Sequence, residues 1–403
     1  MKRRPSVRAA LAVSAARLIN WLSRRTGRGS GTVAGGRVGL RLAPTLLAHL
    51  ARERQVMLVT GTNGKTTTSA LIREGWGLPV AANATGANMP AGHVAALIES
   101  SATAVVLETD EAWLSAVIDQ TQPAVIVLLN LSRDQLDRAS EVRQLGERWR
   151  GALAGVTNCT VVANASDPLV VYAAELAPVV TWVQVPGMWQ HDALSCPHCT
   201  QPLRFAEIWS CACGFTEPTA SVRSDGSRAV FDNEEVELTL ALPGAFNFVN
   251  ATFTLAALRA VGVSLDEAAT RVAGVSSVQG RYGRRTWRGR ELRLLLAKNP
   301  AGVAALLAPG ADLDDEVWVA INAQTADGKD PSWLYDAPFE RLVGHNVRCL
   351  GERRLDLATR LEADGVVATV VDDLNVLTLS QGPVTLIANY TAFRQWMGES
   401  TPC

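Results

Sequence analysis

The chain alternates short apolar runs with longer stretches in which apolar residues recur at helical spacing. In the first half the apolar runs are four to six residues long, which is typical of strands that are buried on both faces. Each run ends in polar residues, and the predicted strands are Val56–Val59, Thr103–Leu107, Ala124–Leu129 and Thr160–Ala163. This alternation predicts a doubly wound α/β domain with a parallel-rich sheet, whose carboxyl edge carries the polar groups.

A second α/β set follows along the chain. Its predicted strands, with helices between them, are Leu292–Ala297, Val317–Ile321, Val347–Leu350, Val366–Val371 and Val384–Ala388. We therefore predict a central domain over residues 51–288 and a C-terminal, Rossmann-like α/β domain over residues 289–403.

The first fifty residues predict a basic, amphipathic helical segment. Arg17 interrupts the apolar stretch, so the segment does not fit a signal peptide. Two interpretations remain open: the helix packs on the central domain with a solvated basic face, or it holds the protein near anionic lipid. The apolar residues that share one face of this helix are Val7, Leu11, Ala15, Leu18 and Leu22.

Charge is distributed unevenly along the chain. Residues 1–52 contain eleven Lys and Arg residues and no acid, so the rest holds 27 basic against 39 acidic residues. The acidic body argues against a nucleic-acid partner. No apolar run reaches the roughly 18 residues of a membrane span. We expect a cytoplasmic protein, with peripheral contact at the inner face of the membrane as the second interpretation of the N-terminal helix.

The stretch from Val56 to Leu71 predicts a strand, a glycine-rich turn and a helix. This is the arrangement in which backbone N–H groups and a helix N-terminus hold phosphate. Lys65 would reach the outer phosphates and the Thr66 hydroxyl would bind Mg²⁺. The match to G-x-x-x-x-G-K-[ST] is incomplete, because Val59 occupies the first glycine position. The candidate ATP ligands in this stretch are Thr62, Asn63, Gly64, Lys65, Thr66 and Thr67.

Three later positions extend this candidate site. Glu108 follows a buried strand directly, and we predict that it is the second Mg²⁺ anchor, although the acids there would also serve to cap the next helix. Asn250, in a predicted helix, is a candidate for contact with the base of ATP, and Asn247 in the same helix is the alternative. Arg284 lies where the central domain is expected to close, and it is a further candidate ATP ligand.

Four cysteines lie close together at about residues 190–218. Cys196 and Cys199 form a regular C-x-x-C turn, and Cys211 and Cys213 form a contracted C-x-C turn. Paired cysteine turns predict a zinc ribbon, with a structural Zn²⁺ bound by the four thiolates. Because the second turn is contracted, His198 remains an alternative ligand. The acidic or neutral flanks favour a structural insertion over a nucleic-acid module.

Several motifs together resemble the Mur ligase family, and its MurT branch in particular, over essentially the whole chain. They include GTNGKTTT, ETDE, NLSRDQLDR, the four-cysteine insertion, KNPAG and ADGKDPSWLYD. The resemblance implies a Mur ligase-like central P-loop domain that uses ATP and Mg²⁺ to convert a carboxylate to an acyl phosphate. It further implies a heterodimer with a glutaminase called GatD, whose ammonia would amidate the α-carboxyl of D-glutamate in the stem peptide of lipid II, a step of peptidoglycan synthesis.

The resemblance also assigns a catalytic role to Asp336. This residue would reach into the partner and complete its Cys–His pair, whereas a loop cap is the simpler explanation. The chain has no lysine between Lys65 and Lys298, so the carbamylated lysine common in muropeptide-extending Mur ligases has no candidate in the central domain. Two positions depart from the family pattern, Ala323-Gln324 and Arg285-Thr286.

Two other functions compete with this one. An autonomous ligase that adds an amino acid to a stem peptide or a folate would share the ATP site but need no partner. A zinc-ribbon protein that acts on nucleic acid would need salt-dependent binding to a polyanion, which the acidic body disfavours.

Overall fold

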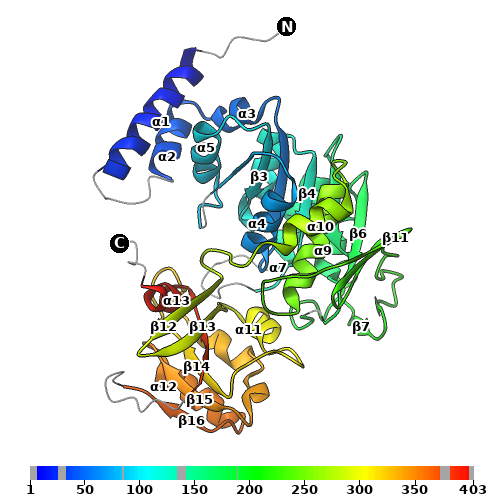
Figure 1. Cartoon of the computed structure of the whole chain (residues 1–403). Coiled ribbons are helices and arrows are strands. Elements are labelled where there is room, and N and C mark those ends of the chain that lie inside the picture. The colour runs from blue at the N-terminus through cyan, green and yellow to red at the C-terminus, as the bar shows by residue number, and fades with distance from the viewer. Residues whose placement is uncertain are drawn as a thin grey trace. The chain divides into compact units, whose positions relative to one another are not determined.

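The computed structural model describes residues 7–25, 33–83, 86–133, 142–187, 189–372 and 382–398. The chain divides into two compact units (Figure 1). The first consists of Met1–Leu131, Val142–Leu240 and Phe248–Val275, and the second of Ser132–Glu141, Ala241–Asn247 and Ser276–Cys403.

The first unit is built on a nine-stranded sheet in the order β11-β10-β9-β6-β5-β4-β1-β3-β2. The strands from β2 to β6 are parallel to their neighbours, which confirms the predicted doubly wound arrangement. These strands are β1 (Gln55–Thr60), β2 (Val80–Ala82), β3 (Ala104–Glu108), β4 (Val125–Leu128), β5 (Thr160–Asn164) and β6 (Val180–Gln184).

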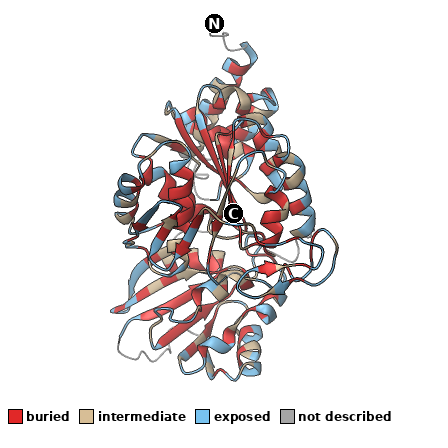
Figure 2. Ribbon diagram, turned by 90° about the vertical axis from the view of Figure 1, so that its right-hand side faces the viewer, coloured by how far each residue is buried: buried red, intermediate tan, exposed pale blue. Residues whose placement is uncertain are grey.

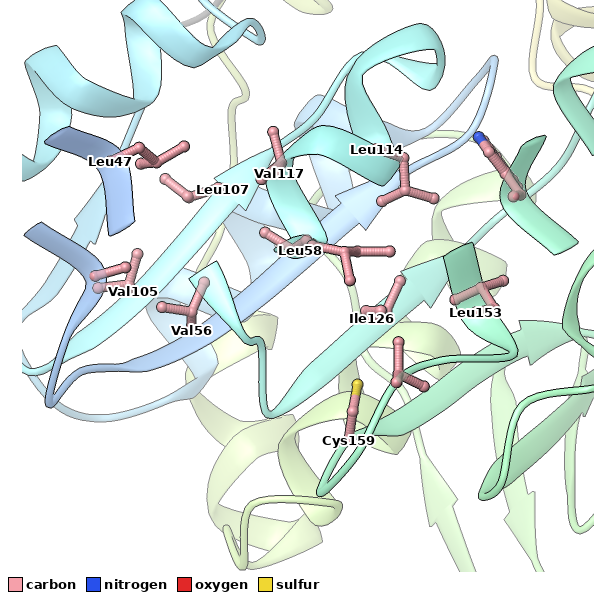
Figure 3. Close-up of a cluster of buried hydrophobic side chains, with 14 of the residues drawn as sticks. Leu47, Val56, Leu58, Val105, Leu107, Leu114, Val117, Ile126, Leu153 and Cys159 are labelled. Carbon is pink, nitrogen blue, oxygen red and sulfur yellow. The ribbon is translucent and has the colours of Figure 1, made fainter. Parts of the chain in front are cut away.

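Helices cover this sheet and bury its apolar residues. Leu58, Val105 and Ile126 come from three neighbouring strands and pack with Leu114 and Val117 of a covering helix (Figure 3). The helices of this unit beyond its N-terminal segment are α4 (Lys65–Gly75), α5 (Pro90–Glu99), α6 (Leu114–Thr121), α7 (Val142–Leu153), α8 (Pro168–Ala174), α9 (Phe246–Arg259) and α10 (Leu265–Ala273), with the short 3-10 helix η1 (Glu111–Trp113).

An antiparallel extension at the sheet edge did not follow from the sequence. It consists of β9 (Val222–Asp225), β10 (Arg228–Phe231) and β11 (Glu234–Glu237), and β9 pairs with β6 in parallel. These strands carry mostly polar residues, so the apolar runs that identify the central strands are absent. The cysteine-rich insertion, with its small hairpin of β7 (Arg204–Phe205) and β8 (Trp209–Ser210), lies in sequence between β6 and β9.

The N-terminal segment forms three helices that pack on the first unit: α1 (Val7–Arg25), α2 (Ala34–Leu42) and α3 (Leu46–Ala51). If α1 simply packed on the body with its basic face in solvent, its leucines would be buried. Instead Ala9, Ala12 and Ala16 are the buried residues, whereas Leu11 and Leu18 are exposed. Small side chains allow a closer approach between helices, which explains why the alanine face is the one that packs.

The second unit has a six-stranded sheet in the order β12-β13-β17-β14-β15-β16. Its central strands are buried and appear in red in Figure 2. The strands are β12 (Tyr282–Trp287), β13 (Arg290–Leu296), β14 (Glu316–Ala320), β15 (Asn346–Leu350), β16 (Ala368–Val370) and β17 (Val384–Ala388). The helices are α11 (Pro300–Leu306), η2 (Ser332–Asp336), η3 (Phe339–Leu342), α12 (Arg354–Ala363) and α13 (Tyr390–Met397).

The second unit begins earlier than the sequence pattern predicts. β12 pairs with β13 in an antiparallel hairpin, so the residues after Ser276 lie with the second unit rather than with a central domain ending at residue 288. The tight turn at Arg288 and Gly289, both in the left-handed region with φ of 49° and 79°, joins these two strands. Because the turn is short, β12 lies directly beside β13 and becomes part of the six-stranded sheet.

Candidate nucleotide site and cysteine cluster

The loop between β1 and α4 has the geometry of a phosphate-binding loop. β1 lies between β3 and β4, and the loop leaves its carboxyl end through Gly61, whose φ is 139°. Gly64 precedes α4 with a φ of 87°, in the left-handed region that a side chain disfavours. Lys65 and Thr66 form the first turn of α4 and are buried. The predicted sequence of strand, glycine-rich turn and helix is therefore present.

Asn130, at the end of β4, fixes the shape of this loop. Its side-chain oxygen accepts a hydrogen bond from the N–H of Asn63 (2.9 Å), and its amide donates to the Asn63 carbonyl (3.0 Å). Its backbone carbonyl accepts from the N–H of Thr62 (3.0 Å). The sequence placed Asn130 in the NLSRDQLDR motif but gave it no role. The last five residues of that motif, 134–138, lie outside the described residues.

The Lys65 ammonium group is already bound to a carboxylate. It lies 2.7 Å from Glu111 Oε1, and it also donates to the Gly61 carbonyl and, at 3.3 Å, to that of Thr62. The Glu111 side chain is only 12% exposed. Glu111 thus occupies a position on Lys65 that a phosphate oxygen would take. The ETDE motif contains Glu111, but the sequence singled out Glu108 instead.

Glu108 ends β3 next to the phosphate-binding loop. In the parallel register it is the partner of Val59, two residues before Gly61. Asn83 binds both the N–H and the carbonyl of Glu108, and His93 Nε2 lies 2.9 Å from the same carbonyl. Burial lowers the pKa of His93 to about 4, so the imidazole is neutral and Nε2–H donates to the carbonyl. The backbone at Glu108 is therefore held rigidly at the edge where magnesium is expected.

The two remaining ATP candidates lie in different units. The Thr68 hydroxyl donates to Asn250 Oδ1 (3.4 Å), and a Cβ at Gly64 would lie 2.7 Å from the same oxygen. Asn250 therefore borders the phosphate-binding loop within the first unit. Arg284 lies on β12 of the second unit, where it binds Glu291 (3.0 Å) and the Tyr282 hydroxyl (2.7 Å). Its contact with ATP stays a prediction.

The four cysteines of the insertion converge on one point. All four Sγ atoms lie within 4.8 Å of one another. Cys196 Sγ is 3.7 Å from Cys213 Sγ, and Cys199 Sγ is 3.4 Å from Cys211 Sγ. Tetrahedral zinc with Zn–S bonds of about 2.3 Å requires sulfur atoms about 3.8 Å apart. The described residues therefore fit a four-thiolate metal site, and the contracted C-x-C turn does not prevent it.

The surroundings of the cluster favour four thiolate ligands over a histidine ligand. The Cys213 N–H, aimed at the Cys211 sulfur, lowers the pKa of that thiol to about 7, whereas burial raises the pKa of the Cys196 thiol, so Cys211 ionises more readily than Cys196. His198 Nε2 lies 2.8 Å from Glu175 Oε1, and its ring packs edge-on against Phe215 and Tyr172. His198 therefore serves to attach the insertion to α8 and its neighbours.

Asp336 ends the short helix η2 in the second unit. Trp333 and Leu334 of the same helix are buried, whereas Tyr335 is 60% exposed. The Asp336 carboxylate lies 3.2 Å from Arg133, which belongs to the same unit, and its side chain is 44% exposed. The buried pair of residues anchors η2, so that Asp336 is presented at the surface at a defined position.

Comparison with known proteins agrees with this architecture. Residues 59–185 match the Mur ligase middle domain, and residues 296–393 match the MurT ligase C-terminal domain. The chain is 28% identical to the lipid II isoglutaminyl synthase (glutamine-hydrolyzing) subunit MurT of Staphylococcus aureus (strain COL), over 94% of this chain and 95% of the relative.

Two solved structures share the fold. A pseudomurein peptide ligase type C from Methanothermus fervidus has a TM-score of 0.66 at 18% identity, covering 86% of this chain and 78% of that protein. The MurF ligase from Thermotoga maritima, solved in complex with ADP, has a TM-score of 0.59 at 16% identity, covering 86% and 80%.

The first unit has a parallel sheet with a phosphate-binding loop at its carboxyl edge, and a second α/β unit follows. This is the Mur ligase-like fold, and the protein is of the class of ATP-dependent carbon–nitrogen ligases. The first half of the chain carries the Mur ligase middle domain, and its second half carries the MurT ligase C-terminal domain. This confirms the resemblance that the sequence motifs indicated.

Proposed function

We propose that this chain is the ligase subunit of a glutamine-dependent amidotransferase that acts on lipid II. It would convert the α-carboxyl of D-glutamate in the stem peptide to an amide, giving D-isoglutamine. The observation that carries the proposal is the whole-chain similarity to a subunit named as a glutamine-hydrolysing lipid II isoglutaminyl synthase. The phosphate-binding loop supports it, because amidation of a carboxylate requires activation by ATP.

The proposed reaction has two steps. A carboxylate oxygen attacks the γ-phosphorus of ATP, ADP leaves, and an acyl phosphate forms. Ammonia then attacks the acyl carbon, phosphate leaves, and a proton is lost from nitrogen. Lys65 would neutralise the charge on the transferring phosphoryl group. Mg²⁺, held by Thr66 and Glu108, would supply further charge neutralisation and align the phosphates.

The nucleotide would be held by the loop residues together with two more distant side chains. The backbone N–H groups of the loop would hold its phosphates, Asn250 would border the base or ribose, and Arg284 is the candidate contributed by the second unit. The ADP complex of the Thermotoga maritima ligase supports an adenine nucleotide as the ligand of this fold. The proposed ATP ligands are Thr62, Asn63, Gly64, Lys65, Thr66, Thr67, Asn250 and Arg284.

A structural zinc ion is proposed for the cysteine cluster. Cys196, Cys199, Cys211 and Cys213 would bind it as thiolates and close the insertion, and no step of the reaction involves this site.

A glutaminase of the GatD type is the proposed partner. The names of the relatives describe a subunit, and they include glutamine hydrolysis. Asp336, presented at the surface at the end of η2, would orient a histidine of that partner. The reaction would take place at the inner face of the membrane, where a lipid substrate is accessible to a peripheral protein. Among the described residues, no helix is long and apolar enough to span a bilayer.

Mass spectrometry of lipid II tests the ligase half of the proposal. The full chain is incubated with lipid II, ATP, Mg²⁺ and ammonium, without a partner, and the product is weighed. Replacement of one carboxyl by an amide supports the proposal, and the Lys65→Ala variant should form no product.

The competing function is an autonomous amino-acid ligase of the Mur or folylpolyglutamate type. It predicts ATP turnover that an amino acid stimulates in the absence of a partner. Such turnover, with no amide formed from ammonium or from glutamine plus glutaminase, would replace the proposal with this alternative.

A further inference from the structure

Helix α1 turns its large apolar side chains away from the protein. Five of them fall within an arc of about 100° on a helix of 3.6 residues per turn. These side chains, which we call the outer face of α1, are Val7 (77% exposed), Leu11 (64%), Leu18 (56%), Trp21 (48%) and Leu22 (45%). A contiguous exposed row of this kind marks an interaction site rather than a part of the core.

Close packing with α2 fixes this orientation. A Cβ at Gly35 would lie 2.2 Å from Asn20 Oδ1, and one at Gly39 would lie 3.5 Å from the Cβ of Ala16. The Asn20 side chain accepts from the Gly35 N–H (3.1 Å) and donates to Glu99 (3.2 Å). If α1 turned its leucines inward, these contacts would be lost and large side chains would meet a surface shaped for alanine. The exposure of the outer face is therefore a property of the fold.

Basic side chains border the outer face on both sides. Arg8 and Arg17 lie about a quarter turn to either side of its centre, and both are exposed. Each also donates one hydrogen bond to a backbone carbonyl of the body, Arg8 to Leu42 and Arg17 to Ile98 (3.1 Å), which leaves the remaining N–H groups of each guanidinium for headgroups. The Arg25 guanidinium lies 5.1 Å from the ring centroid of Trp21, at the end of the row. Residues 1–52 contain eleven basic residues and no acid, so nothing in this segment repels an anionic surface.

We propose that the outer face of α1 docks the protein on an anionic lipid bilayer, with the helix lying in the plane of the interface. An apolar row that enters the boundary between headgroups and acyl chains, flanked by arginines that reach the headgroups, is the pattern of interfacial helices. Each basic residue near an anionic surface adds to the electrostatic attraction. The inference deepens the proposed function by locating the contact with the membrane that holds the substrate.

A protein partner fits this face less well. Stable protein interfaces involve about 20–30 residues on each side and exclude charge from their centre. The outer face is one helix wide and is bordered by arginines. If a second copy bound there, the N-terminal segments of the two copies, both strongly positive, would lie close together. Their repulsion disfavours self-association.

Vesicle sedimentation tests the proposal without any catalytic readout. The full chain is mixed with vesicles of phosphatidylcholine alone or of phosphatidylcholine with phosphatidylglycerol. We expect sedimentation with the anionic vesicles, weaker sedimentation with the neutral ones, and partial release by added salt. The combined variant Leu11→Ser, Leu18→Ser and Leu22→Ser should lose at least about tenfold in binding, because three leucines no longer bury apolar surface in the bilayer.

A matched variant controls for the loss of exposed apolar surface elsewhere. Val343 and Leu355 of the second unit are 59% and 64% exposed, and Val343→Ser with Leu355→Ser should bind anionic vesicles as the unchanged chain does. Since all these positions are exposed, both variants should unfold at the temperature of the unchanged chain.

Three results would overturn the inference. They are equal binding by the triple variant, no binding of the unchanged chain to either vesicle, and a concentration-dependent dimer that the triple variant abolishes. The last result would assign the outer face to a second copy. A chain that binds anionic vesicles but never amidates lipid II would refute the proposed function and leave the docking inference intact.

Discussion

Lys65 and Glu111 form an ion pair at the position where ATP phosphates are expected to bind. Both side chains are nearly buried, and a charge-assisted hydrogen bond of this kind contributes about 1.5–3 kcal/mol. Triphosphate must therefore displace Glu111 from Lys65 or bring a cation that compensates the adjacent carboxylate. We therefore expect nucleotide affinity to depend more steeply on magnesium concentration than it would if no carboxylate were bound to Lys65.

The Glu111→Gln variant tests this dependence. Without Mg²⁺ it should bind ATP at least about tenfold more tightly than the unchanged chain, because a negative charge beside the phosphates is removed. Isothermal titration measures both affinities with and without the metal. Glu74→Gln is the control. Glu74 forms an exposed ion pair with Arg73 on α4, the helix that begins at Lys65, so its replacement should not change ATP affinity with or without Mg²⁺. Unchanged ATP affinity in Glu111→Gln would show that the ion pair does not oppose the nucleotide.

A single buried carboxylate connects helix α8 with the segment that follows β4. Asp167 caps α8 by accepting from the N–H groups of Leu169 and Val170, and its other oxygen accepts from the Leu131 N–H (2.8 Å) after β4. Burial raises the pKa of Asp167 to about 6 from a usual 3.8. The folded state therefore holds this proton more tightly than the unfolded state does.

The difference between the folded and unfolded pKa of Asp167 predicts in which direction the stability of the protein changes with pH. Stability from Asp167 is greatest below its unfolded pKa and is lost as pH rises through the folded pKa near 6. Urea unfolding of the unchanged chain and of Asp167→Asn, from about pH 5 to 7.5, measures the difference. The advantage of the unchanged chain should shrink across this range. A difference independent of pH would mean that Asp167 remains ionised throughout.

The cysteine insertion is the element for which metal content can be predicted. If the cluster holds zinc as proposed, Cys213→Ser should lose it, because a four-thiolate site loses one ligand, and the insertion should then melt at a lower temperature. His198→Ala should keep one zinc per chain, since His198 is bound to Glu175. Metal analysis of the two purified variants decides between the ligands, and zinc lost from His198→Ala alone would reverse the assignment.

At the scale of the whole molecule, the chain is expected to depend on a partner for ammonia. If Asp336 orients a histidine of a glutaminase, Asp336→Asn should lose amidation from glutamine and keep amidation from ammonium. The rate of amide formation from each nitrogen source is measured on the assembled complex. Asp330→Asn, a change in the same loop where the carboxylate accepts from the Ser332 N–H, should affect both sources alike. Equal loss of both in Asp336→Asn would exclude the orienting role.

The sequence predicted the fold where local pattern and tertiary environment agree. Apolar runs identified the parallel strands, and Gly64 with Lys65 identified the phosphate-binding loop. It left two interpretations of α1 open, because the leucine row has the periodicity of a core face, whereas the structure shows that the glycines of α2 pack against the alanine face. The Lys65–Glu111 ion pair and the hydrogen bonds of Asn130 to the phosphate-binding loop could not be predicted from the sequence, because they join residues that lie far apart in it.

The insertion that carries the cysteine cluster leaves and rejoins the sheet at nearly the same place. β6 ends at Gln184, which pairs with Arg223 of β9, so the chain returns to the neighbouring strand after the excursion. A segment closed in this way can open without separating the strands on either side of it. Loss of the proposed metal should therefore expose residues 189–217 to hydrogen exchange while the amides of β1 and β4 keep their protection. The insertion would open as a cooperative unit while the central strands stay folded, although it gains part of its own stability from packing on α8 and β6.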